Sequence, residues 1–363
     1  MSDTKRKAAP VESSPALLAY LDELVEHLWR LIPGAIRGSD ADAIHDARVA
    51  TRRLKAALDL LESAIDHRRL RPFARTLRKL RKRLGPLRDL DVMGDHLREL
   101  KKEADEERLI AITWLEVRID ELRKLAVNEA RDTAPPGKML AKLGTWWGVR
   151  DDISEAAAVT DSLLADSLSR QIATFAKESN RLVAPMSSDA ADAVVDRVDP
   201  HAIRIAGKSL RYTLEMARVQ GFAFSGDVMK SFKRMQDSLG LWHDFIVLTE
   251  RMLSISGDEQ LAHHDAPTQR AILGLSQVTL RSAEEQLDKF AALWIEKGVA
   301  INEAIVRASA GASAGPSTDP DSSSEIVSDA PPAINESQTD RDPSDSEGTA
   351  DREEISPDAP EAA

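Results

Sequence analysis

The chain has 363 residues, of which 42 % are hydrophobic, and its formal net charge is −12. This length and apolar content suffice for one large domain, or two smaller ones, with a buried core. The absence of cysteine excludes disulfides, thiolate metal sites, iron–sulfur clusters and a cysteine nucleophile, and no apolar run approaches the roughly 20 residues that a membrane-spanning helix needs.

The N-terminal segment, residues 1–14, carries basic residues but no apolar stretch that could form a signal peptide. We predict that this segment is disordered. With no membrane-spanning candidate behind it, the sequence predicts a soluble, cytoplasmic protein that does not act at a membrane.

Almost all of residues 15–308 is predicted to be helical, because apolar residues recur at three- and four-residue spacing and strand-like alternation is scarce. The first half contains four of these helices. The second of its helices begins after Asp40, a favourable N-cap residue. The third is predicted to break at Gly85-Pro86. The four predicted helices cover about 16–31, about 41–65, about 71–84 and about 91–126.

Residues 134–156, which contain Trp146 and Trp147, are predicted to be a connector that covers the seam between two halves. A second helical set follows, and four helices, a break and four more suggest a duplication. The two repeats would cover about 15–133 and about 157–308. The helices of the second repeat are predicted over about 157–183, 200–219, 227–239 and 267–308, with a shorter one after Trp242.

Residues 309–363 are rich in Ser, Asp, Pro, Ala and Glu and hold 14 acidic residues against two basic ones. The whole excess of negative charge therefore lies in this segment, and the preceding 308 residues are neutral on average. With few large apolar side chains, the segment cannot offset the entropy lost on ordering. We predict a disordered acidic tail.

Two of the predicted helices carry the same cationic pattern 156 positions apart. In each, a histidine is followed by three basic residues at spacings of three, four and three. At 100° per residue these side chains occupy a sector about 80° wide, opposite an apolar stripe. The two sets are His45, Arg48, Arg52 and Lys55, and His201, Arg204, Lys208 and Arg211.

The helix that follows each of these also carries cations on one side and apolar residues on the other. Residues 45–88 hold 14 Arg and Lys against four acids, and residues 201–234 hold seven against two. Like charges one helical turn apart repel by a few tenths of a kcal/mol per pair, and a bound polyanion would relieve that repulsion. The sequence therefore predicts a polyanion site. An ordinary solvated surface, with ion pairs to acidic helices, is the simpler alternative.

Three motifs resemble those of the CHAD domain, the conserved histidine α-helical domain. They are His45-x2-Arg48-x3-Arg52-Arg53-Leu54, His201-x2-Arg204-x3-Lys208-x2-Arg211-Tyr212, and Gln236-Asp237-Ser238-Leu239-Gly240-x2-His243-Asp244. The resemblance covers about residues 15–308. It implies one compact domain of two pseudo-symmetric four-helix bundles, with a basic groove or pore that binds inorganic polyphosphate. No strand motif of a triphosphate-tunnel domain is present, so the chain looks like the stand-alone form.

The resemblance also implies which side chains would contact polyphosphate. They lie on the two patterned helices and on the helix after each. The residues are His45, Arg48, Arg52, Arg53, Lys55, Arg75, Arg78, Lys79, Lys82, His201, Arg204, Lys208, Arg211, Lys230, Lys233 and Arg234.

The sequence shows no Gly-rich phosphate loop, nucleophile–base pair or cluster of metal-binding carboxylates. We therefore expect non-enzymatic binding, with no catalytic residue, metal or cofactor. Targeting to polyphosphate granules, storage control and regulation of a partner enzyme of polyphosphate metabolism all fit such binding.

The leading alternative is a nucleic-acid-binding or nucleoid-associated helical protein. Such a site usually adds aromatic platforms for bases, and Tyr212 is the one ring within a basic sector. A helical interaction scaffold that uses the acidic tail is a third interpretation.

Two further interpretations concern single residues. Asp89 and Asp244, each shortly after a glycine, are interpreted as N-caps of the helices that follow, and orientation of nearby basic side chains is the alternative. Trp29, Trp114 and Trp294 have apolar neighbours at helical spacing and are predicted to lie in the core.

Overall fold

The structure is a computed structural model that describes residues 16–184, 199–257 and 259–313. These residues form helices and two short 3-10 turns, with no strand among them, so the all-α prediction is confirmed. The predicted disordered N-terminal segment lies outside the described residues, as does the acidic tail from residue 314 onward. No described helix has both the length and the apolar character to cross a membrane.

The helices have the following bounds: α1 Ala16–Arg37, α2 Ala41–Leu61, α3 His67–Lys101, α4 Glu106–Thr133, α5 Pro136–Leu143, α6 Trp146–Glu155, α7 Thr160–Val183, α8 Pro200–Val219, α9 Gly226–Ser256, α10 Glu259–His264 and α11 Ala266–Ser313.

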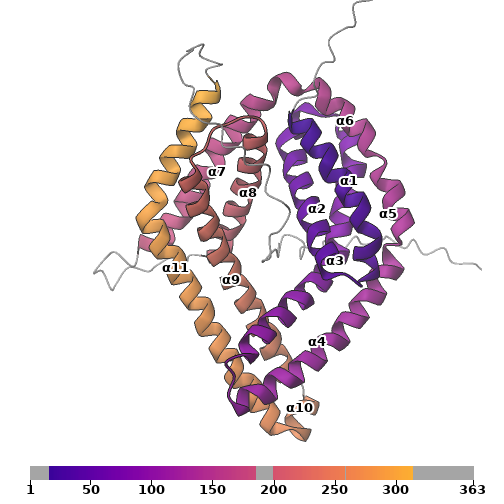
Figure 1. Ribbon diagram of the computed structural model, residues 1–363, viewed down its shortest axis with the longest axis vertical. Coiled ribbons are helices and arrows are strands. Elements are labelled where there is room, and N and C mark those ends of the chain that lie inside the picture. Colours follow the sequence, from indigo (N-terminus) through magenta and orange to yellow (C-terminus); the bar gives the residue numbers. More distant parts are fainter. Residues whose placement is uncertain (1–15, 185–198, 258, 314–363) are drawn as a thin grey trace, which may run out of the picture.

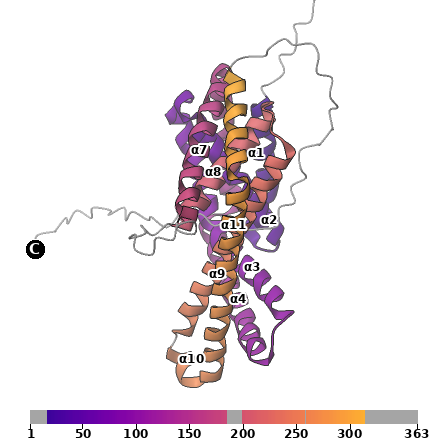
Figure 2. The same cartoon turned by 90° about the vertical axis from the view of Figure 1, so that its left-hand side faces the viewer.

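Two groups of helices stand next to each other and converge toward one end of the molecule (Figure 1). One group contains α1, α2, α5 and α6 with the first part of α3, and the other contains α7 and α8 with parts of α9 and α11. Helices α2 and α8 face each other across the middle. The long helices α3, α4, α9 and α11 extend to the narrow end, where α10 lies. The molecule is much thinner in the view turned by 90° (Figure 2).

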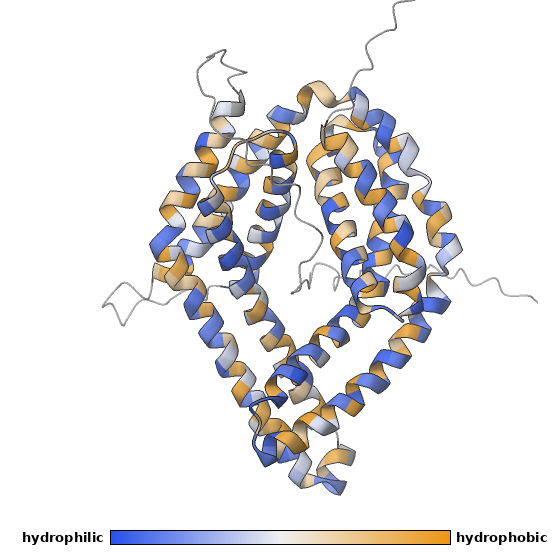
Figure 3. Cartoon of the chain, in the orientation of Figure 1, coloured by the Kyte–Doolittle hydropathy of each residue, from blue (hydrophilic) through white to orange (hydrophobic). Residues whose placement is uncertain are grey.

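Hydrophobic and hydrophilic residues alternate along nearly every helix (Figure 3), and the apolar sides meet in two clusters. The larger one joins helices of both groups and contains Phe73, Phe175, Phe232 and Phe290. The smaller one lies where the long helices converge, and brings residues of α3 and α4 against α9, α10 and α11. Burial of these surfaces is the main force that holds the two groups together.

The predicted helix ends in the first half are partly wrong. α1 continues past Pro33 to Arg37, and α3 continues past Gly85 and Pro86 to Lys101. The chain turns at residues 102–105, within the stretch predicted as one long helix. α9 likewise continues through Gly240. Asp89 and Asp244 therefore lie inside helices, and their interpretation as N-caps is wrong.

Helix α3 passes through Pro86 without ending, and another helix donates a hydrogen bond to it one turn earlier. Proline lacks an N–H, and its ring crowds the carbonyl groups of the preceding turn. Arg48 Nη1 of α2 donates to the carbonyl oxygen of Arg81 at 2.9 Å, in the turn before Pro86. Gly85 permits this approach, because a Cβ there would lie 3.1 Å from Arg48 Nη1.

The predicted connector is helical and belongs to the first group. Trp146 is buried, its Nε1 donates to Asp22 Oδ1 at 2.8 Å, and its ring centroid lies 5.3 Å from that of Phe73. Because α1 and α3 supply these contacts, Trp146 does not cover a seam between the halves. Trp147 is 64 % exposed.

The other tryptophans differ from one another in burial. Trp29 is 44 % exposed, so its prediction as a core residue is wrong, whereas Trp294 is buried as predicted. Trp114 is half-buried beside the smaller cluster.

His27 on α1 gives the stability of the fold a dependence on pH. Burial lowers the pKa of His27 below its ordinary value of 6.5, because desolvation disfavours the imidazolium. The unfolded chain therefore binds this proton at higher pH than the folded chain does. The free energy of unfolding should fall as pH drops below about 6.5. Denaturant unfolding between about pH 7.5 and 5.5 should show a flatter profile for His27→Gln, and an unchanged profile would contradict this role.

Candidate anion-binding site

The two helices that carry the matched cationic patterns are held at their starts by aspartate caps. Asp40 Oδ1 accepts the Ala43 N–H of α2 at 3.0 Å, and Asp199 Oδ1 accepts the His201 N–H of α8 at 2.9 Å. Asp40 therefore caps its helix as predicted. From these starts, the apolar stripes of α2 and α8 enter the core.

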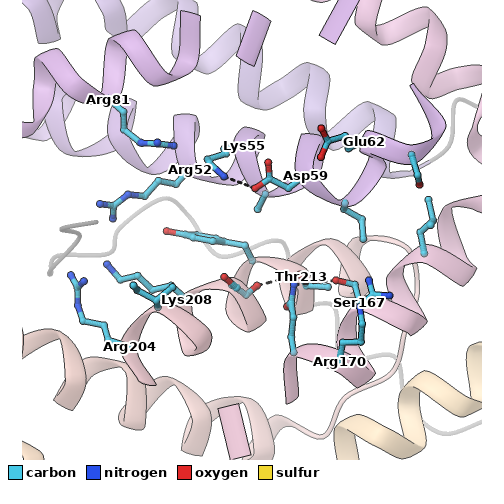
Figure 4. A pocket seen from close by; sticks show the side chains of 18 of the residues that line it. Arg52, Lys55, Asp59, Glu62, Arg81, Ser167, Arg170, Arg204, Lys208 and Thr213 are labelled. Atoms are coloured by element: carbon cyan, nitrogen blue, oxygen red, sulfur yellow. Dashed lines mark hydrogen bonds and ion pairs between the residues drawn. The ribbon is translucent and has the colours of Figure 1, made fainter. Parts of the chain in front are cut away.

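A pocket of about 730 Å³ lies between α2 and α8, with further walls from α3 and α7. Figure 4 shows Arg52 and Arg81 pointing into it from one side and Arg204 and Lys208 from the other. Arginine and lysine outnumber acidic residues in its lining by six to two. The six are Arg52, Lys55, Arg81, Arg170, Arg204 and Lys208, and the two are Asp59 and Glu62.

Three of the lining arginines are deeply buried: Arg52 is 5 % exposed, Arg81 2 % and Arg204 1 %. Charges act on each other more strongly away from water. A guanidinium also presents a planar fork that can bind two oxygens of one phosphoryl group. An anion that reached these side chains would therefore be held more strongly than one on an exposed lysine.

Four of the predicted site residues line the pocket, namely Arg52, Lys55, Arg204 and Lys208. Arg81 and Arg170 line it too but were not predicted. The sequence held a signal for Arg81. Arg81 and Arg88 are two helical turns apart, so they lie on the same side of α3, at the border between its cationic and apolar sides. Both are buried. Arg170 belongs to no cationic stripe in α7, and the sequence offered no signal for it.

Arg53 and Arg211, also predicted site residues, are joined through Glu215. Arg53 Nε lies 2.8 Å from Glu215 Oε2, and Arg211 Nε lies 3.1 Å from Glu215 Oε1. Burial acts to lower the pKa of Arg53, but the charge of Glu215 outweighs it and raises the pKa. Arg53 and Glu215 thus link α2 to α8, and neither of them lines the pocket.

Like Arg53 and Arg211, the other predicted site residues lie outside the pocket lining. Arg48 is buried and bonded to α3, and His45 is half-buried near the start of α2. The His201 ring lies 5.5 Å from that of His243, between centroids. The predicted site residues on α3 and α9 are exposed, except for Lys79, which is half-buried. They are Arg75, Arg78, Lys79, Lys82, Lys230, Lys233 and Arg234.

The bridge through Glu215 should stabilise the fold. In Glu215→Gln the two arginines lose their common carboxylate, and we expect the free energy of unfolding to fall by about 1–3 kcal/mol. Glu116→Gln is the control, because Glu116 forms a more exposed pair with Lys101 at 2.7 Å, which should contribute less than about 1 kcal/mol. Equal losses in denaturant unfolding of the two variants would contradict this role.

No group of three His, Asp or Glu side chains placed to hold a metal ion occurs within residues 16–184, 199–257 and 259–313.

One solved structure supports this fold, and a second match is weaker. The crystal structure of the CHAD domain from the plant Ricinus communis has a TM-score of 0.54 and 21 % identity, and the match covers 77 % of this chain and 90 % of that one. PptA from Streptomyces chartreusis has a TM-score of 0.48 and 15 % identity, covering 78 % and 99 %. A search of curated proteins found no match. The family model of the CHAD domain matches residues 19–253, and the chain therefore belongs to the CHAD-domain family.

Proposed function

We propose that this protein binds inorganic polyphosphate, without catalysing a reaction, in the pocket between α2 and α8. The observation that carries the proposal is the lining of six Arg and Lys against two acids, with three of the arginines buried. Polyphosphate carries about one negative charge per phosphoryl unit and has no bases to be recognised. Arginine forks and a mobile lysine are sufficient to bind such a ligand.

The proposal includes a relation between the two halves, in which the pocket is a basic groove between pseudo-symmetric bundles. The packing supports it: α1 packs on α2 as α7 packs on α8, and α3 pairs with α4 as α9 pairs with α11. The cationic patterns of α2 and α8, 156 positions apart, add to this support.

Nucleic acid is the second candidate, because Tyr212 lines the pocket. Its ring could stack on a base, as aromatic residues do in single-strand binding sites. Tyr212 is only 7 % exposed, however, and a buried ring offers little of its face to a base. The burial of Tyr212 therefore favours polyphosphate over nucleic acid as the ligand.

The test compares the binding of polyphosphate and single-stranded DNA of equal charge at two salt concentrations, by calorimetry. We expect polyphosphate to bind more tightly, and its affinity to fall steeply with salt as condensed counterions are released. Tighter binding of DNA would support the second candidate instead. Release of phosphate from purified polyphosphate would contradict the non-enzymatic assignment.

We further propose that the protein acts in the cytoplasm and gathers at polyphosphate granules. Either storage control or regulation of a partner enzyme would fit such a location. A fluorescent fusion should colocalise with granules in cells that make polyphosphate, and should spread through the cytoplasm when polyphosphate synthesis is removed.

A further inference from the structure

A second pocket, of about 1170 Å³, lies at the narrow end of the molecule, where α10 is found (Figure 1). Residues 109–122 of α4 form one wall of this narrow-end groove, and residues of α9, α10 and the start of α11 form the other. The groove shares no lining residue with the pocket between α2 and α8. A ligand bound here would therefore leave the candidate anion site open.

The α4 wall of the groove is apolar, with its residues at helical spacing. Ile110, Trp114 and Val117 follow one another at four and three residues, and so they lie on the same side of the helix. Ile110 is 49 % exposed and Val117 60 %, while Trp114 is half-buried against the smaller hydrophobic cluster. Exposed apolar side chains that together line one groove are typical of an interaction site.

The dimensions of the groove fit a single helix. Its lining has eight residues of α4 and seven on the opposite side, fifteen in all. A stable interface between two folded proteins takes about 20–30 residues on each side, so a second copy of this chain would need a larger surface. Residues 109–122 extend over about 20 Å, at 1.5 Å per residue. A helix of about 13 residues along them would present three apolar side chains, at i, i+3 or i+4, and i+7.

The charged residues of the lining indicate what else such a helix would carry. Arg118 Nη1 lies 3.0 Å from Glu121 Oε2, so these two charges balance each other. Asp265 Oδ1 accepts the Thr268 N–H at 3.1 Å, at the start of α11. Arg251 of α9 is half-buried, and no carboxylate in the described part of the chain pairs with it. An acidic side chain on the bound helix would form a charge-assisted hydrogen bond with Arg251.

We propose that the narrow-end groove binds an amphipathic helix of a partner protein. Three apolar side chains of that helix pack against Ile110, Trp114 and Val117, and an Asp or Glu pairs with Arg251. Because the groove is separate from the pocket between α2 and α8, the protein can hold this helix and an anion at the same time. Binding of the helix does not require binding of polyphosphate.

A displayed library of helical 14-residue peptides, selected against the full chain, tests the proposal with no partner known in advance. We expect the selected peptides to carry apolar residues at the stated spacing and an Asp or Glu beside them. A synthetic peptide from the selection should bind Val117→Glu at least about tenfold more weakly than the wild type, by fluorescence anisotropy. Val117 is 60 % exposed, so this variant should fold. Selection of no peptide, or of peptides that bind both proteins equally, would overturn the proposal.

Val299→Glu is the matched control, because Val299 is 73 % exposed on α11 and lies outside the groove. It should bind the peptide as tightly as the wild type does, and a loss equal to that of Val117→Glu would overturn the proposal. Replacing the acidic residue of the peptide by Gln should weaken binding to the wild type but not to Arg251→Gln. Equal losses in these two proteins would overturn the role of Arg251.

Sedimentation of the wild type and of Val117→Glu tests the other occupant of the groove. We expect both to be monomers. A wild-type dimer that Val117→Glu dissociates would assign the groove to a second copy and overturn the proposal. Both Val→Glu variants should bind polyphosphate equally well, so a failure of the proposed function would be a separate result.

Discussion

Lys208→Glu is expected to weaken polyphosphate binding by about 10- to 100-fold at low salt. A hydrogen bond to a charged group contributes about 1.5–3 kcal/mol, and each 1.4 kcal/mol corresponds to about tenfold in affinity. Lys208 is half-buried on α8 and points into the pocket beside Arg204. Its reversal should therefore remove one contact and repel the ligand without burying an isolated charge. Calorimetry at two salt concentrations should also show a smaller salt dependence, by about 0.7 per lost phosphate contact.

The matched control is Lys124→Glu on α4. Lys124 is exposed, and its Nζ lies 2.6 Å from Asp120 Oδ2. Because it lies outside the pocket lining, its reversal should change affinity by less than about twofold. Similar losses in both variants would mean that binding follows total charge only. Full binding by Lys208→Glu would exclude this pocket as the site.

Gly298→Ala is expected to lower the free energy of unfolding by about 1–3 kcal/mol. A Cβ at Gly298 of α11 would lie 2.7–3.0 Å from three ring atoms of Trp294. The ring cannot easily move, because Trp294 is buried, its Nε1 donates to Asn180 Oδ1 at 2.8 Å, and its centroid lies 5.3 Å from that of Phe175. The clash should exceed the helix propensity that alanine gains over glycine, about 1 kcal/mol. Thermal or denaturant unfolding measures the change.

Gly274→Ala on the same helix is the control. No atom lies within 4 Å of its added Cβ, so only the propensity gain should remain, about 0.5–1 kcal/mol of stabilisation. A lower free energy of unfolding for Gly298→Ala and a higher one for Gly274→Ala would support the packing of α11 on α7. Stabilisation by both variants would contradict it.

Helix ends were predictable where local chemistry sets them. α8 runs from Pro200 to Val219, as predicted, because Asp199 caps its start and Gly221 follows its end with φ 95°. At Gly85-Pro86 the prediction failed, because the flanking Leu84 and Leu87 are held in the helix by their contact with the hydrophobic core. Such a contact exists only once the helices have packed.

The candidate site shows the same division between local and tertiary information. Helical periodicity indicates which side of α2 and α8 is cationic, and so it predicted Arg52 and Lys208, which line the pocket. It does not indicate which cations a neighbouring helix has already bonded. Glu215 lies one turn after Arg211, but its contact with Arg53 of α2 depends on the packing of the two helices. The contribution of Arg170 likewise depends on where α7 lies.

The most direct test of the account is the structure of this protein bound to polyphosphate. We predict phosphoryl oxygens about 2.7–2.9 Å from the guanidinium or ammonium nitrogens of Arg52, Arg204 and Lys208, between α2 and α8. A chain bound only along the exposed cations of α3 and α9, with no phosphoryl group in the pocket, would contradict the account.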